Sequence, residues 1–159
     1  MHRPSRSSGG VGFSIIELLI VVAILSVIGA IALPRMSRGA GGAAEAALKG
    51  NLAVLRSAID LYRSEHGGAF PSPDRVNDQL TKYTDDLGNT ANVKGGAFEH
   101  QPCLRKVPPM PVGARRGSVL IGVADAAGVG WIYVQATGEI RANTSATEQD
   151  ASGKLYSNY

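Results

Sequence analysis

The chain has 159 residues, of which 44% are hydrophobic, and carries a formal net charge of +3. Arg3 and Arg6 contribute two of these charges and the other basic residues are dispersed, so the composition does not indicate nucleic-acid binding. Cys103 is the single cysteine, which excludes an intrachain disulfide. Apart from one long apolar segment, the length supports one small domain with a modest core.

Residues 1–12 are basic, contain no acidic residue and are rich in serine and glycine. Such a stretch before an apolar segment is typical of a leader that is removed on processing. Residues 13–33 are apolar except for Glu17, and a helix of this length would span roughly 30 Å, which predicts a transmembrane helix. Two cleavage sites fit the residues: a small-residue site at 30–32, and a site after Gly12 that retains the helix.

The sequence from Gly12 to Leu25 resembles the leader region of type IV prepilins and type II secretion pseudopilins. That family has glycine before the cleavage point, phenylalanine after it and glutamate four residues further, as Gly12, Phe13 and Glu17 do here. Pro34 also matches a helix-bending proline of the family. The resemblance implies that a prepilin peptidase cleaves between Gly12 and Phe13 and then N-methylates the new Phe13 amine.

The resemblance also implies an α+β pilin fold, in which one long N-terminal helix packs on a small antiparallel sheet. Residues 1–12 would form the leader, and residues 13–33 the transmembrane and filament-core helix. Residues 34–66 would continue this helix along the head. Residues 67–159 would form the globular head with a flexible C-terminal tail.

Glu17 is the residue to which we assign subunit assembly. A carboxylate near the bilayer centre costs roughly 2.5–3.5 kcal/mol, and such residues usually mark function. Glu17 can offset the Phe13 amine of its own helix, or pair with that of a neighbouring subunit and set the axial register. The alternative is a carboxylate that sits at the membrane interface. Pro34 predicts a helix kink, or simply the end of the membrane segment.

Apolar residues return at helical spacing after residue 43, which predicts that this part of the helix packs on the head. The positions are Leu48, Leu52, Leu55, Ile59 and Tyr62. Gly67 and Gly68 predict the end of the helix close to His66. His66 has no second ligand nearby in sequence, so a metal role is not expected.

A short helix should follow, capped by Asp74, ending near Tyr83 and turning Val76 and Leu80 inward. Residues 84–96 are polar and predict an irregular solvated loop.

The prolines within residues 105–111 predict extended chain rather than a central strand. Residues 118–123, 130–134 and 139–142 predict strands, and the last two would be joined by a turn that ends in a left-handed Gly138. One strand face, with a partly exposed Trp131, could contact a neighbour, although core packing is the default for this residue.

No catalytic constellation is evident in the sequence, and we expect the protein not to be an enzyme. Cys103 lacks an activating histidine or acid at informative spacing. We also expect no metal or other cofactor, with calcium as the alternative, because major pseudopilins can bind calcium in a C-terminal loop. Asn143, Glu148 and Asp150 could supply oxygens, although their spacing matches no known loop.

The sequence therefore predicts a structural subunit of a type II secretion pseudopilus, of the major kind, which polymerises through its N-terminal helix to drive secretion across the outer membrane. The alternatives are a type IV pilus subunit and a membrane-anchored domain of another class. Expected partners are further copies and other pseudopilins, the prepilin peptidase and methyltransferase, the inner-membrane assembly platform and the membrane, but no nucleic acid. The resemblance implies an inner-membrane protein whose head lies in the periplasm, in an envelope-spanning filament once assembled.

Overall fold

The computed structural model describes residues 13–159, without the side chains of residues 31–40. The predicted leader, residues 1–12 with Gly12, therefore lies outside the described residues. The chain divides into two compact units, Met1–Gly39 and Ala40–Tyr159, which are described separately below. The architecture is α+β and is compatible with a pilin fold.

The first helix, α1, comprises Ile15–Glu65. Its end follows from two glycines in the left-handed region, Gly67 at φ 62° and Gly68 at φ 91°. The Gly68 amide reaches back five residues and donates to the Arg63 carbonyl at 2.8 Å, which closes the last turn. The predicted helix end is confirmed to within one residue.

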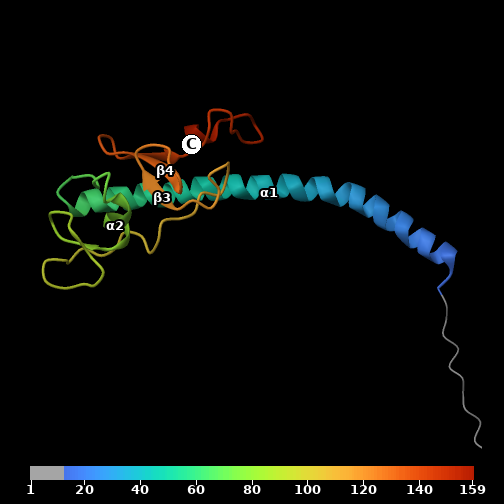
Figure 1. The fold of residues 1–159 in the computed structure, drawn as a ribbon, viewed down its shortest axis with the longest axis horizontal. Helices are drawn as coiled ribbons and strands as arrows, with labels where there is room; N and C mark the ends of the chain where they lie inside the picture. Colours follow the sequence, from blue (N-terminus) through green and yellow to red (C-terminus); the bar gives the residue numbers. More distant parts are fainter. Residues whose placement is uncertain (1–12) are drawn as a thin grey trace, which may run out of the picture. The chain divides into compact units, whose positions relative to one another are not determined.

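Within the second unit, one face of α1 forms part of the core. The predicted stripe is confirmed, because Leu48, Leu52, Leu55, Ile59 and Tyr62 are all at most 3% exposed. These residues pack in one cluster with Trp131, Tyr133 and Ile140 of the sheet. Figure 1 shows β3 and β4 beside this part of α1.

The second helix, α2, is short and comprises Val76–Thr81. Val76 and Leu80 are buried, as predicted. The predicted cap is wrong: Arg75 occupies the N-cap position, and no side chain caps the helix. Asp74 instead lies 3.9 Å from the Arg75 guanidinium, on the surface.

The prediction that residues 84–96 form an irregular loop is only partly correct, because this segment contains part of a small sheet. The strands β1 (Tyr83–Thr84) and β2 (Thr90–Ala91) pair antiparallel on either side of a tight turn. Two-residue strands carry too few positions to show an alternating pattern, which explains why the sequence did not reveal them.

A three-stranded sheet has the order β3 (Leu120–Gly122), β4 (Val129–Val134), β5 (Glu139–Ala142). β4 and β5 pair antiparallel across a turn that ends at Gly138, φ 74°, as predicted. β3 runs parallel to β4, with a register irregularity between Leu120 and Ile121. The expectation of a wholly antiparallel sheet is therefore wrong for this pair.

Trp131 on β4 is completely buried, at 0% exposed, which confirms the expected core packing and excludes the alternative of a partly exposed ring. Its indole N–H donates to the Pro108 carbonyl at 2.8 Å. Strand alternation identifies residues on the same face but does not say which face the rest of the chain covers.

The C-terminal segment packs on the head through Tyr156 and Tyr159, and the flexibility expected of it stays a prediction. Its final residues form the 3₁₀ helix η1, Tyr156–Asn158. Arg56 donates to the Tyr159 carbonyl at 2.6 Å, and Glu45 accepts from the Ala151 amide at 3.1 Å. Lys49 lies 5.1 Å from the centre of the Tyr159 ring. These three α1 residues fasten the segment to the helix.

Candidate functional site: an apolar helix and polar clusters of the head

The first part of α1 exposes apolar side chains on all sides. Each of its large hydrophobic residues between positions 13 and 28 is at least 42% exposed. They are Phe13, Ile15, Ile16, Leu18, Leu19, Ile20, Val21, Val22, Ile24, Leu25, Val27 and Ile28. A helix that is hydrophobic all round is normally buried against something else, so this segment is the candidate interaction surface.

Phe13 precedes α1, and Glu17 lies in its first turn. Both residues are exposed. Residues four apart lie on the same side of a helix, which leaves Glu17 one turn from the position of Phe13. Pro34 lies within the bounds of α1, but its side chain is among those not described, so the predicted kink is not tested.

In the part of the chain that the structure describes, no helix is both long and apolar enough to cross a membrane. The prediction of a transmembrane helix over residues 13–33 is therefore not supported.

The predicted calcium ligands of the head have protein partners. Glu148 accepts hydrogen bonds from the Ala114 amide at 2.5 Å and from the Ser145 amide at 2.7 Å. These bonds lower the pKa of the Glu148 carboxyl, and the bond from Ser145 has the largest effect. The Asp150 carboxylate accepts both the amide and the hydroxyl of Ser152, at 2.8 and 2.7 Å. These bonds lower the pKa of Asp150, the hydroxyl contributing most.

Asn143, the third predicted ligand, lies with Glu148 around a hollow of about 290 Å³. Its amide nitrogen donates to Asp125 Oδ1 at 2.8 Å, and the Arg115 guanidinium contacts the same oxygen at 2.5 Å. The Asn143 bond and then the Arg115 charge lower the pKa of Asp125. Asp150 does not line this hollow, so the three predicted residues are not brought together.

Sequence reasoning missed Asp125, which is 18 residues from Asn143. The available signal was an acidic residue in the short connection between two predicted strands, residues 124–129. Among residues 13–159, no group of three or more histidine, cysteine or acidic side chains is placed to hold a metal ion. Calcium binding at Asn143, Glu148 and Asp150 stays a prediction.

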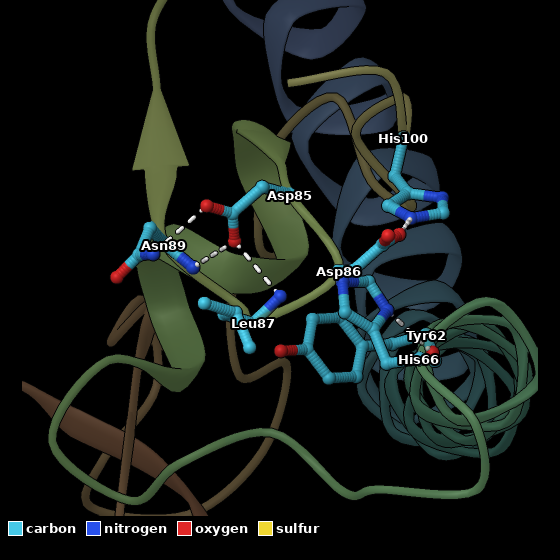
Figure 2. Close-up of polar contacts among 7 residues, drawn as sticks. All are labelled: Tyr62, His66, Asp85, Asp86, Leu87, Asn89 and His100. Carbon is cyan, nitrogen blue, oxygen red and sulfur yellow. Dashed lines mark hydrogen bonds and ion pairs between the residues drawn. The ribbon is translucent and has the colours of Figure 1, made fainter. Parts of the chain in front are cut away.

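A second polar cluster joins the end of α1 to the loop after β1 (Figure 2). The His66 ring stacks on Tyr62, with ring centres 3.8 Å apart, and lies 4.7 Å from the His100 ring. The Tyr62 carbonyl can only accept, so His66 Nδ1 carries the proton and donates to it at 2.8 Å. His100 in turn donates to Asp86 at 2.9 Å. The cluster anchors the loop to the helix.

Cys103 is a free, partly buried thiol. Burial, followed by the negative charge of Glu65, raises its pKa to about 11. A nucleophilic cysteine needs the thiolate at neutral pH, and this environment favours the thiol instead.

No protein-family model matches the chain, and no solved structure matches it either. Among curated proteins, the chain is similar to the type II secretion system core protein G of Pseudomonas aeruginosa. The two are 28% identical over 102 residues, which cover 64% of this chain and 68% of the relative. This similarity supports the pseudopilin family that the residues around Gly12 and Phe13 predict.

Proposed function

We propose that this chain is a structural subunit of a type II secretion pseudopilus. The observation that carries the proposal is the uncovered apolar surface of residues 13–28, which contains one acidic residue, Glu17. The similarity to a type II secretion core protein G supports the same assignment. A filament of many copies provides what an all-round apolar helix needs, because each copy covers the helices of its neighbours.

In this proposal, cleavage after Gly12 creates the ammonium group of Phe13, and N-methylation keeps it cationic. Glu17 of one copy pairs with the Phe13 ammonium of the next. Inside an apolar bundle an unpaired carboxylate is costly, so copies that are out of register are penalised and the pair sets the axial step. The role is structural rather than catalytic.

The proposed partners are further copies, other pseudopilins, the prepilin peptidase and methyltransferase, and the inner-membrane assembly platform. Before assembly, we propose an inner-membrane location with the head, residues 67–159, in the periplasm. Alkaline carbonate extraction of cell membranes tests this location, since a peripheral protein is released and an integral one is retained.

N-terminal mass spectrometry of the purified protein tests the processing step. A chain that begins at N-methylated Phe13 is the expected result. A chain that begins at Met1, in cells with an active prepilin peptidase, or one that begins at Pro34, contradicts the proposal.

Co-expression with wild-type subunits tests the role of Glu17. Glu17→Ala should be cleaved normally yet be excluded from filaments sheared from the cells, whereas Glu17→Asp, which keeps the charge, should enter them at least in part. Normal incorporation of Glu17→Ala would remove Glu17 from the assembly step.

A further inference from the structure

The turn between β1 and β2 presents an apolar side chain to solvent between acidic groups. Leu87 at its tip is 84% exposed, and the side chain of Asp86 is 95% exposed. Glu99 lines the same surface hollow as these two residues. We refer to Asp86, Leu87 and Glu99 as the acidic tip.

The acidic tip is held in one conformation by the residues beneath it (Figure 2). Asp85 Oδ1 accepts the amides of Leu87 and Asn89, at 3.0 and 2.8 Å, and its other oxygen accepts the Asn89 side chain at 2.8 Å. The Gly88 carbonyl accepts from buried Gln79 at 2.8 Å. These bonds hold the backbone of the turn, and a backbone that is already ordered loses little conformational entropy when it binds.

The acidic tip is also attached to the core of the head. Asp86 accepts a hydrogen bond from His100, and His100 pairs with Thr84 through both backbone groups at 3.1 Å. The contact between the His100 and His66 rings continues this connection to the end of α1. The acidic tip is therefore connected through His100 and His66 to the end of α1.

A groove whose charge is opposite to that of the acidic tip lies between α2, the extended segment 105–107 and β3. Its volume is about 530 Å³, and its apolar residues are Val107, Val119 and Leu120. Val119 and Leu120 remain 44% and 46% exposed. We refer to it as the basic groove.

The charged residues that line the basic groove are all cationic: Lys82, Arg105 and Lys106. Lys82 pairs with Asp78 at 2.8 Å, whereas Arg105 and Lys106 are exposed. The groove thus offers an apolar floor and a positive rim, and the acidic tip offers an apolar knob and a negative rim.

We propose that the acidic tip of one copy docks in the basic groove of a second copy. The contact rests on the proposed function, because it adds a head-to-head interaction to a filament held by its helices. Opposite charges at the rim align the two surfaces, and burial of Leu87 supplies the apolar contact. A small contact suffices, since the helices already hold neighbouring heads at high effective concentration.

Disulfide trapping between copies tests the contact directly. In a Cys103→Ser background, Leu87→Cys and Val119→Cys should form disulfide-linked dimers in cells that also yield normal amounts of filament. The matched control combines Leu87→Cys with Val54→Cys, since Val54 on α1 is comparably exposed, at 49%. The control pair should give at most background dimer.

Charge exchange tests the specificity of the contact. Lys106→Glu or Glu99→Lys alone should lower the dimer yield about two- to fivefold, as expected for exposed ion pairs. The two changes together should restore it. If Lys106→Glu impairs secretion but leaves the dimer yield unchanged, the groove serves a different protein and the proposal is wrong.

The filament measurement separates this proposal from the proposed function. Normal filaments without the 87–119 disulfide overturn the docking contact and leave the proposed function intact. The disulfide without filaments supports the contact and counts against the filament. If both are absent, the proposed function fails and the docking contact fails with it.

Discussion

The side chain of Asn77 on α2 pairs with both backbone groups of Ile121 on β3. Its amide nitrogen donates to the Ile121 carbonyl at 2.8 Å, and its oxygen accepts the Ile121 amide at 2.9 Å. Ile121 is buried and lies on an outer strand of the three-stranded sheet. One side chain therefore takes the place of a neighbouring strand and closes part of the edge.

Asn77→Ala should destabilise the head by about 1–3 kcal/mol, because it leaves two partly buried backbone groups without partners. Thermal unfolding followed by circular dichroism gives the change. Gln101→Ala, at an exposed position of the head, is the control and should stay within about 0.5 kcal/mol of wild type. Equal unfolding temperatures for the two variants would show that water replaces Asn77 at the strand edge.

The buried stripe of α1 offers a comparison between adjacent residues. Leu55→Ala should cost about 2–5 kcal/mol, since Leu55 is 0% exposed and its loss leaves a cavity. Val54→Ala, one position away and 49% exposed, should cost far less. Urea titration of both variants measures the difference, and similar midpoints would contradict the assigned core face.

Gly88 tests how tightly the acidic tip is built. Its φ is +74°, and a Cβ there would lie 2.5 Å from the Tyr62 hydroxyl and 2.8 Å from Gln79 Nε2. Gly96 has a similar φ of +60° with open space around it. Gly96→Ala should cost about 1–2 kcal/mol from backbone strain, and Gly88→Ala more, because it adds the steric clash. Equal costs would mean that Tyr62 and Gln79 yield without penalty.

Acid should weaken the fastening of the C-terminal segment. The pKa values of Asp150 and Glu148 are lowered in the folded protein. The two carboxylates therefore contribute to the free energy of unfolding above the unfolded pKa of about 4, and this contribution is lost as pH falls through the folded pKa. Unfolding measured from pH 7 to pH 3 should show a smaller loss for Asp150→Asn than for wild type. Asp74→Asn, at an exposed position, is the control and should follow wild type.

Alkali acts on buried Tyr133, whose hydroxyl donates to the Pro71 carbonyl at 3.0 Å. Burial raises its pKa to about 12. The contribution of Tyr133 to the free energy of unfolding is complete below the unfolded pKa of about 10, and it is lost as pH rises toward the folded pKa. Tyr133→Phe should therefore reduce the loss of stability between these values, whereas Tyr83→Phe, at a partly exposed position, should not. Parallel alkaline profiles for Tyr133→Phe and wild type would contradict this assignment.

The features that the sequence predicted correctly are those with a local signal. Leucines at spacings of three and four identified the core face of α1, and Gly67, Gly68 and Gly138 marked the left-handed positions that turns require. The pattern of Gly12, Phe13 and Glu17 led to the pseudopilin family that the sequence comparison supports.

The features that were missed depend on distant partners. The parallel pairing of β3 with β4 and the contacts of Asn77 are fixed by packing rather than by neighbouring residues. Asp85 organises its turn through a side chain, in a stretch with no apolar period. Local pattern alone carries no information about such contacts.

The hydrogen bond between Arg56 and the Tyr159 carbonyl has a consequence for biosynthesis, because the two residues are 103 positions apart in the chain. At a translation rate of about 5–20 residues per second, α1 leaves the ribosome several seconds before the residues that hold it. Glu45, Lys49 and Arg56 therefore have no partner in the C-terminal segment until residues 151–159 have been synthesised, and the head can close only after that.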